Sequence, residues 1–194
     1  DFDILDVNMG CPVPKVVRNH EGSALMEDLP LAEKILSRMV QAVDKPVTVK
    51  CRLGFTDSHI NVLEFARCAE SAGVSAIVIH GRTREQYYRG KANWEWIRRA
   101  KEVVQIPVFG NGDIFKEEDA EAMLLSTGAD GIALARGIQG NPFLIRRIRE
   151  YLGRGEKLKP IKKEERQEMM KSVLNLLNLN RHGKIRMRSM RLGL

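Results

Sequence analysis

The strongest constraint on the fold is a repeated alternation between short apolar runs and longer amphipathic stretches. The short runs are rich in β-branched residues and have the length of buried strands; they cover Asp3–Asn8, Pro46–Arg52, Ala76–His80, Ile106–Gly110 and Gly131–Ala135. The longer stretches have helical periodicity and cover Leu31–Val43, Asn61–Ala72, Trp94–Val104, Glu117–Ser126 and Pro142–Leu152. A chain that alternates strands with helices in this way builds a parallel sheet.

Polar side chains stand where the predicted strands end. They follow all five strands and comprise Asn8, Lys50, Arg52, His80, Asn111, Asp113 and Arg136. Apolar strands alone fit either a doubly wound sheet or a closed barrel, but polar residues at every strand end are expected where the ends ring one pocket. The pattern therefore predicts an α/β fold of the (β/α)₈ TIM-barrel type. Five of the eight βα units are visible, so we expect about three more units upstream of residue 1.

The composition and hydrophobic pattern of the sequence change after Gly155. We expect one domain over residues 1–155 and an appendage over 156–194, in which Lys163–Leu179 has helical periodicity with Met170, Val173, Leu174 and Leu177 on one face. The segment Arg181–Leu194 is basic and weakly patterned, which fits either the start of a helix or a disordered end.

The charge is concentrated in the C-terminal part. Residues 146–194 hold 15 Lys and Arg residues against 5 acidic ones, a net charge of +10, while residues 1–145 hold 17 against 20, a net charge of −3. A basic appendage on a nearly neutral body favours a polyanionic partner such as nucleic acid, although solvated helix faces are often basic too.

Composition excludes several classes of protein. With 43% hydrophobic residues the chain can bury a core. No apolar run approaches the roughly 18 residues that cross a bilayer, so we predict no membrane association. The three cysteines form no close pair, which favours a reducing, cytoplasmic location without disulfides. We also predict no metal site.

Cys11 is the candidate catalytic residue. It lies in the loop Asn8-Met9-Gly10-Cys11-Pro12, which follows the first predicted strand. A free thiol has a pKa of about 8.5 and is mostly protonated near neutral pH, so it can deliver a proton. An isolated cysteine can also be a small buried hydrophobe, and this is the interpretation we give to Cys51 and Cys68, which lie within a strand and a helix.

Two glycine-containing loops are candidates for binding a phosphate group. Gly110–Asp113 and Ala135–Gly137 follow the last two predicted strands, where phosphate sites recur in TIM barrels. Glycines allow close approach of the backbone, and Arg136 suits a bidentate phosphate contact. Ordinary βα turns use the same residue types, so the evidence lies in both loops occurring together.

Lys50 and His80 end two neighbouring predicted strands. A cation at Lys50 could stabilise negative charge on a cofactor or form a Schiff base with a carbonyl substrate. His80 is either structural or part of the pocket rim. The loop Arg82–Lys91, which contains Arg84, interleaves cations with tyrosines, as in sites that hold a nucleic-acid backbone and stack a base, and it could equally be a solvated loop.

Taken together, several motifs resemble the bacterial tRNA-dihydrouridine synthases. They are Asn8–Pro12, the strand end Val47–Lys50, His80-Gly81-Arg82-Thr83-Arg84-Glu85-Gln86, Gly110–Asp113 and Gly131–Gly137, which match in order and spacing over about residues 1–155. The resemblance implies a TIM barrel that binds FMN, is reduced by NADPH and adds hydrogen across the C5–C6 bond of a uridine extruded from tRNA. It also implies that residues 156–194 are a linker and the start of a helical tRNA-binding domain.

The resemblance assigns roles to individual residues. Cys11 would donate the proton to C5 while the flavin N5 gives hydride to C6. The residues that would contact FMN are Lys50 and His80 at the flavin and Asn111, Gly112, Asp113, Ala135 and Arg136 at its phosphate. Those expected to bind substrate are Asn8, Arg52, Arg82 and Arg84. We expect the complete protein to be monomeric. We expect the 194-residue chain alone to be poorly soluble or weakly flavinated, because a closed barrel requires eight strands and five are visible.

Three alternatives remain open at this point. A flavin barrel dehydrogenase acting on a free pyrimidine would use the same phosphate loops and a similar cysteine. An inactive RNA-binding remnant would bind tRNA without flavin, because five-eighths of a barrel exposes sheet edges. A Lys50 Schiff-base aldolase would be trapped by borohydride.

Overall fold

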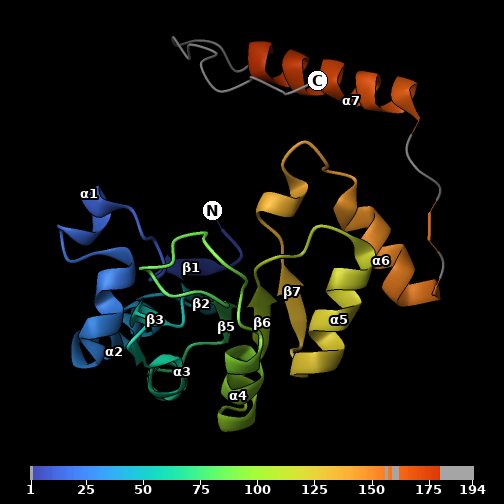
Figure 1. Ribbon diagram of the computed structural model, residues 1–194. Helices are drawn as coiled ribbons and strands as arrows, with labels where there is room; N and C mark the ends of the chain where they lie inside the picture. The colour runs from blue at the N-terminus through green and yellow to red at the C-terminus, as the bar shows by residue number, and fades with distance from the viewer. Residues whose placement is uncertain (1, 156, 159–161, 180–194) are drawn as a thin grey trace. The chain divides into compact units, whose positions relative to one another are not determined.

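The computed structural model describes residues 2–155, 157–158 and 162–179, and its centre is a five-stranded parallel sheet. The strands are β1 (Leu5–Asn8), β2 (Val47–Cys51), β5 (Ala76–His80), β6 (Val108–Asn111) and β7 (Gly131–Ala133). Their order in the sheet is β1-β2-β5-β6-β7, which is also their order along the chain (Figure 1). Consecutive order without reversal is the topology of a βα barrel and differs from a doubly wound sheet, whose strand order reverses. The predicted fold class and all five strands are confirmed.

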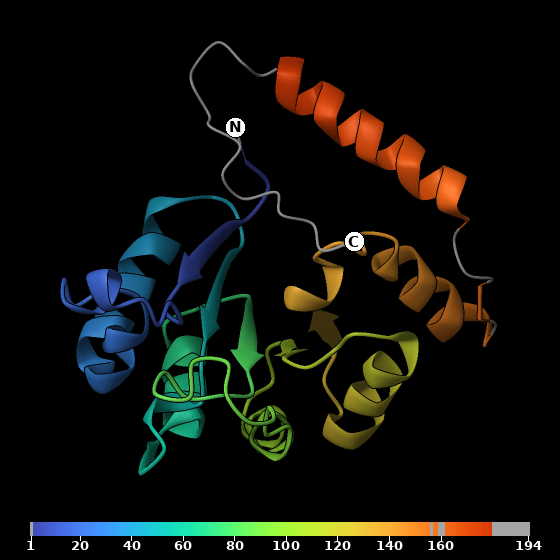
Figure 2. The ribbon, with the colours of Figure 1, turned by 45° about the horizontal axis from the view of Figure 1, so that its top comes forward.

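The register of the sheet aligns the carboxyl ends of neighbouring strands. Asn8 pairs with Lys50 at the ends of β1 and β2, and His80 pairs with Asn111 at the ends of β5 and β6. The polar residues predicted to share one edge therefore do so. The outer strands β1 and β7 do not pair with each other, so the described strands form an open sheet (Figure 2).

Four long helices connect the strands and contact one another in sequence order: α2 (Leu29–Ala42), α3 (Val62–Ser71), α4 (Glu95–Val103) and α5 (Glu117–Thr127). Each lies within one or two residues of its predicted range. Helix α2 begins after Asp28, whose carboxylate accepts a hydrogen bond from the Leu31 amide at 3.0 Å and so caps the helix. The predicted helical periodicity thus identified the elements that cover the sheet.

The core lies between the strands and these helices. Val49, Ile77 and Ile79 from the sheet are fully buried, as are Leu36 of α2 and Phe65 of α3. Burying one such side chain contributes about 1.5–3 kcal/mol, so this layer holds the strand ends in place.

Several short elements were not predicted. A 3₁₀ helix, η1 (Gly22–Glu27), and the short helix α1 (Pro14–Val17) follow β1. A small antiparallel pair, β3 (Gly54–Thr56) with β4 (His59–Ile60), follows β2. A second 3₁₀ helix, η2 (Arg136–Ile138), follows β7. These segments span at most six residues, too few for a periodic pattern to emerge.

The C-terminal part contains two helices, α6 (Leu144–Arg154) and α7 (Lys163–Leu179), and α7 has the predicted bounds. The described residues divide into two compact units that separate between Ile148 and Arg149, within α6. The expected boundary after residue 155 remains a prediction. On the predicted face of α7, Met170 is exposed, whereas the side chains of residues 173–179 and the segment Arg181–Leu194 lie outside the described residues. Among the described helices, none is long and apolar enough to span a membrane.

Candidate active site at the strand C-termini

The carboxyl ends of the sheet surround a pocket of about 360 Å³. Ten of the twelve residues singled out from the sequence line it: Asn8, Cys11, Lys50, Arg52, His80, Asn111, Gly112, Asp113, Ala135 and Arg136. The structure does not place Arg82 and Arg84 in the pocket lining. A volume of this size, with apolar walls and a few polar groups, suits a small-molecule ligand.

The Cys11 loop is fixed by hydrogen bonds to its backbone. The Asn8 carboxamide oxygen accepts from the Gly10 amide at 3.1 Å, and Arg52 Nε donates to the Gly10 carbonyl at 2.9 Å. The Cys11 carbonyl accepts from the Ser23 hydroxyl at 2.8 Å and from the Ser23 amide at 3.1 Å. These contacts hold the half-buried thiol at the pocket wall.

The other two cysteines lie in the structural framework, as expected. Cys51 is fully buried in β2, and burial raises the pKa of its thiol to about 12. Cys68 lies in α3, where its thiol donates to the Leu29 carbonyl at 3.6 Å and its pKa is raised by burial and by Glu33. Neither thiol lines the pocket.

Lys50 and His80 are adjacent strand-end residues whose charge states depend on burial. Burial lowers the pKa of Lys50 below its ordinary value. His80 is 5% exposed, and burial together with Arg52, Lys50, Arg82 and Arg136 lowers its pKa to about 3. At neutral pH the His80 imidazole is therefore uncharged, with one donor and one acceptor nitrogen.

Arg52 was predicted to face the substrate, and the structure gives its guanidinium other partners. Besides the Gly10 carbonyl, Nη1 donates to the carbonyls of Thr83 at 2.8 Å and Tyr87 at 2.9 Å. The side chain is buried and lies 5.6 Å from the centre of the Tyr88 ring. Arg52 thus ties the Cys11 loop to the loop of residues 82–91, and direct contact with substrate remains a prediction.

Arg82 and Arg84 also turn toward the protein. Arg82 is 1% exposed and donates to the carbonyls of Arg89 at 3.0 Å and Gly90 at 2.5 Å, which closes the 82–91 loop at its base. The Arg84 guanidinium lies 5.0 Å from the centre of the Phe55 ring. These positions favour roles in ordering the loop; substrate binding by either residue remains a prediction.

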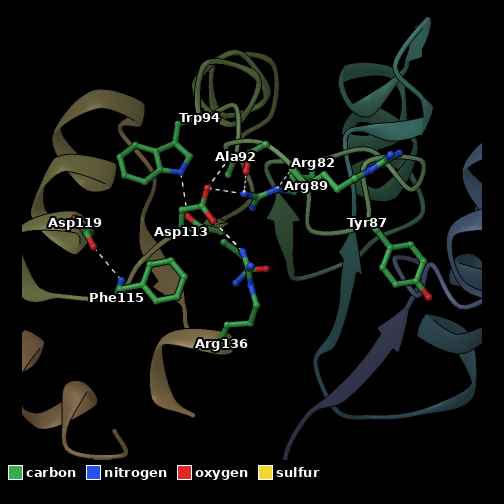
Figure 3. A network of polar contacts seen from close by, with 12 residues as sticks. Arg82, Tyr87, Arg89, Ala92, Trp94, Asp113, Phe115, Asp119 and Arg136 are labelled. Atoms are coloured by element: carbon green, nitrogen blue, oxygen red, sulfur yellow. Dashed lines mark hydrogen bonds and ion pairs between the residues drawn. The ribbon is translucent and has the colours of Figure 1, made fainter. Parts of the chain in front are cut away.

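Asp113 connects two arginines at the far side of the pocket (Figure 3). Its carboxylate accepts from Arg82 Nη2 at 2.7 Å, from the Ala92 amide at 2.7 Å and from Arg136 Nη2 at 2.8 Å. Burial alone would raise the pKa of Asp113, but the hydrogen bonds from Arg82 and Ala92 and the nearby arginine charges hold it below its ordinary value. The carboxylate is ionised at neutral pH.

Gly112 and Asn111 shape the loop before Asp113. Gly112 has a φ of 121°, and a Cβ there would lie 2.8 Å from the Ala92 Cβ, so both conformation and packing require glycine. Its carbonyl accepts from Trp94 Nε1 at 3.1 Å. Asn111 donates to the Ala133 carbonyl at 2.6 Å and so links the ends of β6 and β7.

Two aromatic rings complete the pocket, and one of them, Phe115, was missed by the sequence analysis. Arg136 lies 4.9 Å from the centre of the Tyr88 ring and 5.6 Å from that of Phe115. Both rings are about half exposed. The signal for Phe115 was its position directly after Gly110-Asn111-Gly112-Asp113-Ile114, on a loop already assigned to the rim. In the described part of the chain, no cluster of His, Cys, Asp or Glu could hold a metal ion.

The consecutive parallel strands and the cationic pocket at their carboxyl ends define a βα-barrel protein with a ligand site in the usual position for that fold. A family profile described as Dihydrouridine synthase (Dus) matches residues 1–193. The chain belongs to the dihydrouridine synthase family.

Individual relatives agree with this assignment. The chain is 48% identical over 155 residues to a probable tRNA-dihydrouridine synthase 1 from Synechocystis, covering 80% of this chain and 44% of the relative. It is 44% identical over 177 residues to tRNA-dihydrouridine synthase B from Shewanella oneidensis, covering 91% and 55%. The chain thus spans about half the length of these curated relatives. Among solved structures, an old yellow enzyme homologue from Zymomonas mobilis matches with a TM-score of 0.49 and 19% identity, covering 71% of this chain and 40% of that one.

Proposed function

We propose that the complete protein is a tRNA-dihydrouridine synthase that uses FMN and NADPH to reduce the C5–C6 bond of a uridine in tRNA. The observation that carries this proposal is the convergence of Cys11, Lys50, His80 and Arg136 on one pocket. The relatives named above are described as tRNA-dihydrouridine synthases, which supports the same substrate class. The proposal includes a cytoplasmic location, which the three free cysteines of the described residues favour.

The pocket residues fit FMN by the chemistry of their donors. Lys50 and Arg136 provide positive charge at the wall, and neutral His80 provides a hydrogen-bond donor and acceptor. Ala133, Leu134 and Ile114 add apolar surface for a flat ring system. FMN, when bound here, would supply the hydride chemistry.

Each side of the pocket would then have a distinct task. Arg136, together with the backbone of Gly112 and Ala135, would bind the phosphate group. Lys50 and His80 would contact the polar edge of the ring system, with Lys50 favouring negative charge there. Arg52 would keep the Cys11 loop in a fixed position relative to the loop of residues 82–91.

Cys11 would supply the proton in this scheme. Addition of hydride at C6 would leave an enolate-like carbon at C5, and a thiol on a fixed loop is a suitable acid to protonate it. The loop contacts described above leave the thiol at the pocket wall while the backbone on both sides of it is restrained. Arg146 and Arg149 of α6 are exposed and would provide positive charge for an RNA partner.

The proposal is tested on the complete protein purified with its natural ligands. We expect a visible flavin absorption band and reoxidation of the NADPH-reduced flavin by unmodified tRNA, with dihydrouridine formed in equal amount. Free uridine and free uracil should not reoxidise the flavin at a comparable rate. Absence of a flavin band would refute the cofactor assignment, and efficient turnover of the free base would select the dehydrogenase alternative.

A further inference from the structure

Asp113 uses both of its carboxylate oxygens within the protein. Oδ2 accepts from Arg82 Nη2 and from the Ala92 amide, each at 2.7 Å, and Oδ1 accepts from Arg136 Nη2 at 2.8 Å. A carboxylate repels a phosphate group, because both are negatively charged. Asp113 is therefore poorly suited to direct contact with an anionic ligand, even though it lines the same pocket as Arg136.

The three charged groups come from the ends of three consecutive strands in the sheet. Arg82 follows β5, Asp113 follows β6 and Arg136 follows β7, and Figure 3 shows Asp113 between the two arginines. The Arg82 side chain is 2% exposed. Without the negative charge of Asp113, that buried guanidinium would keep the Arg89 and Gly90 carbonyls as partners but would lose its charged link to Arg136.

Arg136 is linked to the 82–91 loop by two routes. One runs through Asp113 to Arg82, which closes the base of the loop through the Arg89 and Gly90 carbonyls. The other is the stacking of the Arg136 guanidinium on the ring of Tyr88, which belongs to the same loop, at 4.9 Å. Within the described part of the chain, the ion pair with Asp113 uses one nitrogen of Arg136 and leaves the others for a ligand.

We propose that Asp113 is a positioning residue that couples an anion bound at Arg136 to the order of the 82–91 loop. Asp113 restrains the Arg136 side chain before a ligand arrives, so less side-chain freedom is lost on binding. An anion at Arg136 in turn restrains the guanidinium and, through Asp113 and Tyr88, the loop. The coupling is reciprocal: a disordered loop weakens anion binding as much as anion loss loosens the loop. Where the anion is the phosphate of FMN, this inference rests on the proposed function.

Asp113→Asn in the complete protein is the variant that tests the coupling. Asparagine has nearly the same shape, tolerates the positive φ of 58° at this position and can still accept from the Ala92 amide, but it lacks the charge. Asp130→Asn is the matched control. Asp130 also accepts from a backbone amide, that of Val108 at 2.8 Å, and pairs with Lys101 at 2.8 Å, but it lies at the opposite end of β6.

Affinities for FMN and for riboflavin, which lacks the phosphate, separate positioning from general structural damage. We expect Asp113→Asn to weaken FMN binding about tenfold and to leave riboflavin binding unchanged. Hydrogen exchange should show that FMN protects the amides of residues 82–91 in the wild type and much less in Asp113→Asn. Asp130→Asn should change neither measurement. An equal loss of both flavins, or unaltered protection of the loop, would overturn the inference.

The experiment also distinguishes failure of this inference from failure of the proposed function. If the wild-type protein binds neither flavin, the proposed function is wrong, and the exchange measurement is made with inorganic phosphate instead. Protection of residues 82–91 by phosphate that is lost in Asp113→Asn would then support the positioning role. Equal exchange in the two proteins would rule it out.

Discussion

The loop after β1 and the loops after β6 and β7 face the same pocket but are held by different interactions. The Cys11 loop is held through its backbone, by Asn8, Ser23 and Arg52. The opposite rim is held through side chains, by the ion pairs of Asp113 with Arg82 and Arg136. Because the Cys11 loop is anchored through its backbone, the Cys11 thiol is available for chemistry. On the opposite rim, the ion pairs of Asp113 determine how much positive charge a ligand encounters. Substitutions on the two sides should therefore affect different steps.

The sharpest test of this comparison is Cys11→Ala in the complete protein. We expect uridine reduction to slow by about a hundredfold or more, the usual cost of removing a general acid. FMN binding and flavin reduction by NADPH should be retained, because the loop is fixed without the thiol. The measurement is single-turnover reoxidation of the reduced flavin by unmodified tRNA.

Cys68→Ala is the matched control for that experiment, since its thiol lies in α3 and does not line the pocket. It should leave the rate of uridine reduction unchanged. If Cys11→Ala reoxidises its flavin at the wild-type rate, Cys11 has a structural role. The two sides of the pocket would then not differ in the chemical step they affect.

A smaller effect is expected on the ion-paired side. Arg136→Ala should weaken FMN binding by about tenfold or more, because a charged hydrogen bond contributes roughly 1.5–3 kcal/mol. Riboflavin affinity should change little, and flavin fluorescence titration measures both. Arg98→Ala is a suitable control, since Arg98 pairs with Glu95 and Glu102 on the exposed surface of α4. Normal FMN binding by Arg136→Ala would place the phosphate site elsewhere.

The smallest expected effect concerns pH. The folded protein holds His80 neutral with a pKa of about 3, whereas the unfolded chain titrates near 6.5. The unfolded state therefore binds more protons below pH 6.5, so stability is full above that pH and falls as the pH decreases toward 3. Between pH 7.5 and pH 5.5, we expect the free energy of unfolding of His80→Gln to fall by about 1 kcal/mol less than that of the wild type.

Urea unfolding at the two pH values measures this difference directly. Because His20 is exposed, His20→Gln serves as the control and should follow the wild type. If the free energy of unfolding depends on pH in the same way in the wild type and in His80→Gln, the His80 imidazole is solvated in the folded protein. The nearby lysine and arginine charges would then not lower its pKa.

The amino-acid pattern is sufficient to predict the main strands and helices and the edge of the sheet on which the site lies. Periodicity located the five strands and the long helices, because burial on one or both faces imposes an apolar pattern on each segment. The strand-end positions of Asn8, Lys50, His80 and Asn111 followed from that pattern, since parallel strands bring their carboxyl ends to one edge. The short elements β3, β4, η1 and η2 lie below the length at which a pattern can be recognised.

The directions of the arginine side chains depend on contacts that the sequence pattern does not reveal. Arg52, Arg82, Arg84 and Arg136 all follow strands and are equivalent in a linear sequence. In the structure Arg52 and Arg136 line the pocket, whereas Arg82 and Arg84 do not, and the Arg52 guanidinium is bound by backbone carbonyls of neighbouring loops. A guanidinium goes where carbonyls, carboxylates or ring faces can satisfy it, and these partners come from loops far apart in the chain. The same reason makes Asp113 a bridge between two cations, a role that depends on three strand ends meeting in space.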